Sequence, residues 1–298
     1  MLPSPRGAPA VRGRRQFSDG TAGPVNSTDR YIDTDLGTLR VRVTGSGPPM
    51  LLWPSLLMDH TLWDDQVAHF SARFTTYAID PPGHGAGTAL DRPFTFDECV
   101  QCVVRILDDA GIDRAHFIGN SWGAMIGATF AARHPERILT SVLMNGTASP
   151  AGARQRLEYS ALLVLARAIG GFSGPVMRAA LSAFLGPTSM RDRPDVVARV
   201  RRMVRANKVG SAAHAVRSVV VHRPDQRPLL AGIRTPTLVV GGRQDSIFPP
   251  AELEDMARAI PGAELLFLDD AAHLVAVEVP DRVNTLIDEF LNRHEPSR

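Results

Sequence analysis

Short apolar runs alternate with amphipathic helical patterns over most of the chain, and this alternation constrains the fold more than any other feature. The runs lack the in–out alternation of a half-exposed strand, so they predict strands buried on both faces of a parallel sheet. The helical patterns between them supply the crossovers that parallel strands need. The predicted strands are a hairpin of Tyr31–Asp35 and Thr38–Thr44, then Met50–Trp53, Phe74–Asp80, Ala115–Gly119, Ser141–Met144, Thr237–Val240 and Glu264–Leu268. The sequence therefore predicts a doubly wound, mostly parallel α/β sheet of eight strands.

The alternation stops in residues 147–227, where helical patterns follow one another without a strand pattern between them. We interpret this segment as a helical cap inserted into an α/β core that comprises residues 31–146 and 228–298. The cap helices need a surface on which to bury their apolar faces, and the carboxyl edge of the sheet, where open α/β sheets bind ligands, is the expected place. Residues 1–30 are rich in Pro, Arg, Gly and Ser without periodicity, which predicts a disordered tail.

Composition narrows the classes of function. The formal net charge of +2 argues against a dedicated nucleic-acid binder, and no apolar run approaches the roughly 18 residues that span a bilayer. The two cysteines, Cys99 and Cys102, lie one turn apart inside a helical pattern, which favours two buried helix residues over a redox or metal pair. We expect a cytoplasmic protein that binds neither nucleic acid nor membranes, with a small molecule as its partner. A homodimer is an open alternative to a monomer.

One pentapeptide carries the main chemical signal. Gly119-Asn120-Ser121-Trp122-Gly123 reads G-x-S-x-G, and it falls where an apolar strand pattern ends and a helical pattern begins. A serine on such a sharp turn has a strained backbone and an exposed hydroxyl, and the flanking glycines let strand and helix pack closely. A plain Gly/Ser turn is the alternative, so the decision depends on partners elsewhere in the chain.

A nucleophilic serine needs a base and an orienting acid, and candidates for both follow later predicted strands. Asp245 lies on the loop after Thr237–Val240, and His273 lies on the loop after Glu264–Leu268. His273 would take the proton from Ser121, and Asp245 would fix the tautomer of its ring. Asp269 and Asp270 are rival acids, but they are too near His273 in sequence to come from a separate strand.

The oxyanion of an acyl-transfer reaction needs two N–H donors. The residue after the nucleophile, Trp122, commonly supplies one of them. The other is expected from the loop after Met50–Trp53, where Pro54 has no N–H, so the donor is Ser55 or Leu56; we favour Leu56. The side chains of Trp53, Ser55 and Trp122 are predicted substrate contacts, although ordinary packing explains the two tryptophans equally well.

The remaining motifs indicate neither a metal nor a cofactor. The glycine-rich segment Asp80–Gly87 contains His84, which has no Cys, Asp or Glu at ligand spacing, so we expect the segment to pack beside the Ser121 turn. No H-E-x-x-H, Walker or dinucleotide motif occurs. The cap offers candidates that would bind an acidic substrate group, although a solvated surface position is the favoured interpretation of each: Arg154, Arg178, His214, His222 and Arg223.

These motifs together resemble the α/β-hydrolase family with a helical cap, over roughly residues 31–298. The matching segments are the Ser121 pentapeptide, Asp80–Gly87, Pro236–Pro250 and Ala272-His273-Leu274. The histidine segment, with Val277–Pro280, and the segment Trp53–Leu57 are similar to the 3-oxoadipate enol-lactonase-like group. The resemblance implies a triad of Ser121, Asp245 and His273 with Leu56 and Trp122 as oxyanion donors. The chain departs from the family pattern at Pro54-Ser55, where His-Gly is usual, at Leu57, where Gly is usual, and at Trp122, where a small residue or methionine is usual.

The sequence thus predicts a serine hydrolase that cleaves an ester or lactone through an acyl-enzyme, without a cofactor. The same residues would also suit a C–C bond hydrolase, a biosynthetic cyclase or lyase, or an acyltransferase. A ligand receptor that has kept the three residues without using them is the alternative from a different class of function.

Overall fold

The computed structural model describes residues 26–294, and its centre is a single twisted sheet of eight strands. The strand order is β1-β2-β4-β3-β5-β6-β7-β8. Strand β2 pairs antiparallel with β1 and β4, and every other neighbouring pair is parallel. The predicted eight-stranded, mostly parallel sheet is therefore confirmed. The strands are β1 Ser27–Thr34, β2 Gly37–Gly45, β3 Pro49–Trp53, β4 Thr75–Ile79, β5 Ala115–Asn120, β6 Ile138–Met144, β7 Thr237–Gly242 and β8 Glu264–Leu268.

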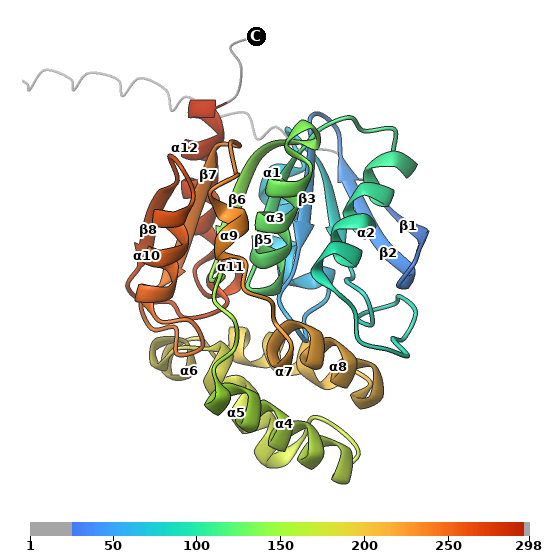
Figure 1. The fold of residues 1–298 in the computed structure, drawn as a ribbon, viewed down its shortest axis with the longest axis vertical. Helices are drawn as coiled ribbons and strands as arrows, with labels where there is room; N and C mark the ends of the chain where they lie inside the picture. The colour runs from blue at the N-terminus through green and yellow to red at the C-terminus, as the bar shows by residue number, and fades with distance from the viewer. Residues whose placement is uncertain (1–25, 295–298) are drawn as a thin grey trace, which may run out of the picture.

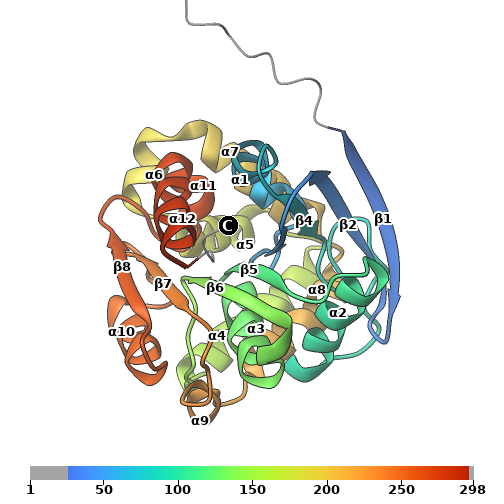
Figure 2. The ribbon, with the colours of Figure 1, turned by 90° about the horizontal axis from the view of Figure 1, so that it is seen from above.

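Helices cover both faces of the sheet, as expected for strands that carry apolar residues on both sides. Figure 2, seen from above, shows α2, α3 and α10 on one face and α1, α11 and α12 on the other. Strands β3 and β5 at the centre are buried along nearly their whole length. The helices of the core are η1 His60–Trp63, α1 Asp64–Phe70, α2 Phe96–Asp109, α3 Trp122–Arg133, η2 Pro135–Arg137, α10 Pro250–Ala259, α11 Val275–Glu278 and α12 Pro280–His294.

A layer of helices lies between β6 and β7 in the chain and gathers at one end of the sheet, below the core in Figure 1. Its longest member, α4, presents Leu163 and Ala166 inward and has several apolar side chains exposed. The helices of this layer are α4 Ala153–Ala168, α5 Gly174–Phe184, α6 Pro187–Asp192, α7 Pro194–Ala206, α8 Val209–Val216 and the π-helical segment η3 Arg217–Val221. The short helix α9 Arg227–Leu230 follows them in the chain but packs against α3 and α10 of the core. The short helices α6, α9 and α11 were not predicted, because four to six residues are too few to show a helical periodicity.

The boundary of the predicted tail needs correction. Strand β1 begins at Ser27, so residues 27–30 belong to the sheet, where their backbone groups pair with β2. Most of this edge strand is exposed, so its residues do not alternate between apolar and polar. Without that alternation, the sequence pattern resembled that of the tail. Residues 1–25 lie outside the described residues. Within residues 26–294, no helix combines the length and the apolar content that crossing a bilayer requires.

Candidate active site

Ser121 sits on a sharp turn between β5 and α3. Its φ of 56° and ψ of −108° are strained values for a residue with a side chain. A Cβ on Gly119 would meet the backbone of Gly123 at 2.2 Å, and a Cβ on Gly123 would meet the carbonyl oxygen of Trp53 at 2.0 Å. Only glycine fits at either place, so both glycines of the motif are required by the close approach of β5, α3 and β3.

The structure brings the three predicted residues together in one hydrogen-bonded chain. Ser121 Oγ lies 2.7 Å from His273 Nε2, and His273 Nδ1 lies 2.8 Å from Asp245 Oδ2. All three residues are buried, although they come from loops after three different strands. A proton on Nδ1 that is donated to the carboxylate leaves Nε2 free to accept the serine proton. The rival acids do not share this contact, since Asp269 pairs with Arg243 and Asp270 pairs with Arg193.

The carboxylate of Asp245 is held by donors on both oxygens. Its Oδ1 accepts the backbone N–H groups of Ile247 and Phe248 at 2.8 and 3.1 Å. Its Oδ2 accepts a hydrogen bond of 2.9 Å from Asn145 Nδ2 as well as the one from His273. Asn145 follows β6 and has a positive φ of 50°. Sequence analysis missed this residue because its partner lies one hundred positions further along the chain.

The segment that carries His273 is anchored to the helical layer as well as to the sheet. The buried carboxylate of Glu278 accepts the backbone N–H groups of Ala272 and Leu274 at 2.8 and 3.2 Å. The same carboxylate accepts the hydroxyl of Ser189 in α6 at 2.6 Å. Burial raises the pKa of Glu278 and outweighs these hydrogen bonds, which act in the opposite direction. Glu278 therefore ties the residues on both sides of His273 to the helical layer.

Two backbone N–H groups near Ser121 suit the predicted oxyanion donors. Trp122 is the first residue of α3, where a backbone N–H has no partner within the helix. On the loop after β3, Leu57 N donates to His84 Nε2 at 3.1 Å, so this group is engaged. Among the described residues, Leu56 N makes no hydrogen bond, and Leu56 lines the same cavity as Ser121. The choice of Leu56 and Trp122 stays a prediction that this geometry supports.

A cavity of about 90 Å³ opens beside Ser121 and His273. Its walls come mostly from apolar side chains of the helical layer and from the loop after β7. They include Leu56, Met125, Leu163, Phe172, Val176, Phe184, Val219, Ile247 and Phe248. An apolar cavity with a few polar groups is typical of a site for a small organic molecule.

Three predicted substrate contacts are wrong. Trp53, Ser55 and Trp122 are buried in the core and are absent from the lining of this cavity. The ring of Trp122 lies 5.6 Å from that of Trp53 and stacks on Phe94 at 5.4 Å, measured between centroids. The sharp turn places Ser121 at the wall of the cavity and directs the next side chain into the core, so the bulk of Trp122 fills the core rather than the site.

Of the predicted cap candidates for an acidic group, only Arg223 lines the cavity. It follows η3 and is 5% exposed, whereas Arg154, Arg178 and His222 are exposed. Its Nε donates to the carbonyl oxygen of Ser149 at 2.8 Å, and its Nη2 donates to Gln155 Oε1 at 3.1 Å. Burial lowers the pKa of Arg223 to about 10, which still leaves the guanidinium charged at neutral pH.

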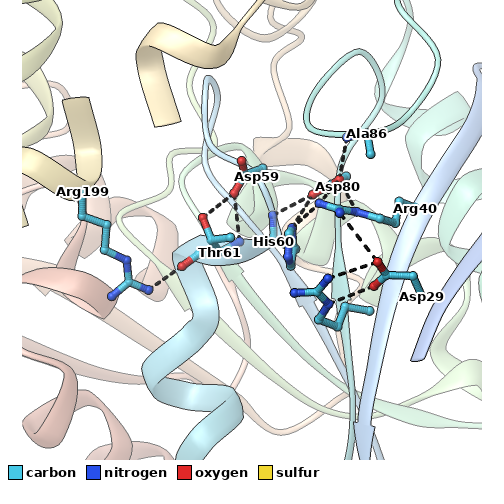
Figure 3. A network of polar contacts seen from close by, with 9 residues as sticks. Asp29, Arg40, Asp59, His60, Thr61, Asp80, Ala86 and Arg199 are labelled. Atoms are coloured by element: carbon cyan, nitrogen blue, oxygen red, sulfur yellow. Dashed lines mark hydrogen bonds and ion pairs between the residues drawn. The ribbon is translucent and has the colours of Figure 1, made fainter. Parts of the chain in front are cut away.

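A second polar network lies behind the loop that carries Leu56, and Figure 3 shows it. Asp59, His60 and Asp80 lie close enough to hold a metal ion, but Arg40 already supplies a cation there, with Nη2 2.7 Å from Asp80 Oδ2. Asp80 also accepts the backbone N–H groups of His60 and Ala86 at 2.9 and 2.8 Å. This network fixes the loop after β4 against β2, and the guanidinium of Arg40 balances the charge of Asp80.

Comparisons with known proteins agree with this architecture. A family model described as the alpha/beta hydrolase fold matches residues 48–280. The 3-oxoadipate enol-lactonase 2 of Acinetobacter baylyi is 26% identical over 246 residues, which are 83% of this chain and 89% of that protein. The crystal structure of a hydrolase from Pseudomonas aeruginosa is 30% identical with a TM-score of 0.81, covering 91% of this chain and 99% of that one. The enol-lactonase of Burkholderia xenovorans is 29% identical with a TM-score of 0.77, covering 88% and 100%.

Proposed function

Since this chain belongs to the α/β-hydrolase fold family, we propose that it is a serine hydrolase that cleaves an ester or lactone of a small organic molecule. The observation that carries the proposal is the hydrogen-bonded chain from Ser121 through His273 to Asp245, which opens into an apolar cavity. A structural or binding role does not need a serine hydroxyl, an imidazole and a carboxylate in this order. The comparisons support the hydrolase class, and a lactonase is among the similar proteins.

The proposed reaction passes through an acyl-enzyme. Ser121 Oγ attacks the carbonyl carbon while His273 Nε2 accepts the serine proton, and the backbone N–H groups of Leu56 and Trp122 stabilise the oxyanion. Collapse of the tetrahedral intermediate expels the alcohol or enolate, which takes the proton from His273. A water molecule then attacks the acyl-enzyme, gives its proton to His273, and releases the acid as Ser121 recovers its hydrogen. Asp245 keeps the imidazole oriented and stabilises its charged form throughout.

A fluorophosphonate probe tests the nucleophile directly. We expect one equivalent to attach to Ser121, because attack of an activated serine on the phosphorus displaces fluoride and leaves a phosphonylated serine, which requires an adjacent base. Digestion and mass spectrometry of the labelled peptide identify the residue. Absence of labelling on a protein that also fails to hydrolyse p-nitrophenyl esters, lactones and dioxo acids would instead support a ligand receptor, and cleavage of the dioxo acids alone would support a C–C bond hydrolase.

The charge of Arg223 favours a substrate with an anionic end. Within residues 26–294, no carboxylate forms a salt bridge with this guanidinium, whose Cζ lies over the Phe248 ring, 5.2 Å from its centroid. Its Nη1 makes no hydrogen bond to the described residues. The carboxylate of Glu252 is near enough to raise the pKa of Arg223 but does not form an ion pair with it. A buried charge without a direct partner is costly, so a carboxylate on the substrate would gain affinity by pairing with it. The relative named for 3-oxoadipate, a dicarboxylic acid, is consistent with this substrate class.

Replacing Arg223 by methionine should change substrate preference more than activity. The matched substrates are p-nitrophenyl hydrogen adipate, which carries a free carboxylate, and its methyl ester, which is neutral. We expect kcat/KM for the charged substrate to fall about 30-fold, or about 2 kcal/mol, while the neutral substrate changes little. Arg223→Lys should keep part of the preference. Equal losses on both substrates would contradict the anionic subsite without affecting the proposed triad.

A further inference from the structure

The loop after β3 contains a leucine in a backbone conformation that favours glycine. Leu57 has a φ of 64°. The carbonyl oxygen of Ser55 accepts the N–H of Met58 at 3.1 Å, so Leu57 is the third residue of a β-turn. A positive φ at this position is typical of a type II turn and usually requires glycine or asparagine. Such strain persists only where the surroundings hold the residue in place.

His84 supplies that hold from the core side. Its Nδ1 lies 2.9 Å from the carbonyl oxygen of Pro82, which can only accept, so the proton is on Nδ1. Nε2 is therefore the acceptor for Leu57 N at 3.1 Å. Burial lowers the pKa of His84 and favours this neutral form. The network is internally consistent, because each nitrogen of the ring has a partner of the right kind.

The helical layer holds the other side of the same residue. Asn207, which directly follows α7, donates from Nδ2 to the carbonyl oxygen of Leu57 at 2.9 Å. The peptide groups before and after Leu57 are thus each fixed by one side-chain hydrogen bond. A type I turn differs from a type II turn by rotation of the central peptide group, which here joins Leu56 to Leu57. The hydrogen bond to His84 fixes that group and prevents the rotation.

Both predicted oxyanion donors lie next to His84. Leu56 immediately precedes the residue that His84 binds, and its own N–H is free among the described residues. The ring of His84 also contacts the ring of Trp122, with 5.5 Å between centroids. His84 does not line the cavity, so it does not reach a substrate itself. Its contacts instead join the two segments of chain that would form the oxyanion hole.

We propose that His84 is a positioning residue for the oxyanion hole: as a neutral acceptor for Leu57 N–H, it holds the strained turn in which the N–H of Leu56 faces the reacting carbonyl. The proposal rests on the proposed serine hydrolase function and adds a residue to it. It also explains how a leucine replaces the glycine that the turn prefers, since the histidine compensates for the strain.

Two substitutions at position 84 distinguish the role of His84 as a hydrogen-bond acceptor from the packing role of its aromatic ring. His84→Phe keeps the aromatic contact with Trp122 but removes the acceptor, whereas His84→Gln keeps a carbonyl acceptor at about the reach of Nε2 but removes the ring. We expect His84→Phe to lower kcat for p-nitrophenyl butyrate about 100-fold, the smaller of the losses typical for one oxyanion donor, with KM within about threefold. His84→Gln should stay within about tenfold of the wild type. Inhibition by a butylboronic acid, whose adduct places an oxygen in the hole, should weaken in parallel with kcat.

A purely structural role predicts the opposite order, with His84→Phe close to the wild type and His84→Gln impaired, and this result would overturn the proposal. A double-mutant cycle with Leu57→Gly guards against poor folding of the single variant. Glycine adopts the positive φ without strain, so in the Leu57→Gly background His84→Phe should cost less than about tenfold. An undiminished loss in that background would also overturn the proposal. Turnover that survives Ser121→Ala would instead reject the triad, so the two failures are distinguishable.

Discussion

Replacing Ser121 by alanine should lower kcat for p-nitrophenyl butyrate by about 10⁵-fold or more, as the loss of a triad nucleophile does in other serine hydrolases. Without Oγ there is no acyl-enzyme, and the residual rate reflects only the oxyanion donors and the cavity acting on water. The fold should persist, because alanine tolerates the φ of 56° about as well as serine does. Steady-state kinetics and a thermal unfolding curve measure the two quantities.

Ser160→Ala is the matched control, since Ser160 is an exposed serine on the outer part of α4. It should leave both measurements unchanged. If Ser121→Ala retained more than about a tenth of the wild-type rate, the serine would not be the nucleophile, and a mechanism in which His273 acts as a base without acylation would take precedence.

Replacing Asp245 by asparagine should lower kcat by about 10⁴-fold through the tautomer of His273. The amide can still accept the N–H groups of Ile247 and Phe248 through its oxygen, so the loop should keep its conformation. Its nitrogen then faces His273 Nδ1 and donates to it, which places the ring proton on Nε2. In that tautomer the imidazole cannot accept the proton of Ser121.

Asp269→Asn provides the comparison. Asp269 lies on the loop before His273, and its exposed carboxylate pairs with Arg243. The kcat of this variant should equal that of the wild type. Rates measured with the fluorophosphonate probe should follow the same order as kcat. A large loss in Asp269→Asn together with a small one in Asp245→Asn would exchange the roles of the two acids.

The sheet and the three residues of the candidate triad could be predicted because their signals are local. Ser121 lies in a motif whose glycines are fixed by contacts between neighbouring segments, and Asp245 and His273 each follow a recognisable strand. The wrong substrate contacts have the same local origin. Sequence alone does not say whether the side chain of Trp122 turns toward the site or the core, because that depends on the direction of a single turn.

The remaining features depend on contacts between distant residues. Asn145 and Asp245 are one hundred positions apart, and Arg223 becomes part of the cavity only when η3 folds back on α4. Nothing in the segment around His84 indicates that its ring accepts a hydrogen bond from Leu57, twenty-seven positions earlier. Such pairings carry no periodic or compositional signal, so they become visible only in three dimensions.

The anchoring of the His273 segment by Glu278 matters for anyone who would graft the helical layer of one relative onto the sheet of another. Junctions drawn at the end of β6 and the beginning of β7 would exchange the cavity walls that the helices supply but leave Glu278 in the recipient core. The new helices would then have to present a hydroxyl and an N–H where Ser189 and Gly186 now lie, each hydrogen-bonded to this carboxylate. A chimera without these two groups would gain a new cavity, but the segment that carries His273 would lose its anchor to the helical layer.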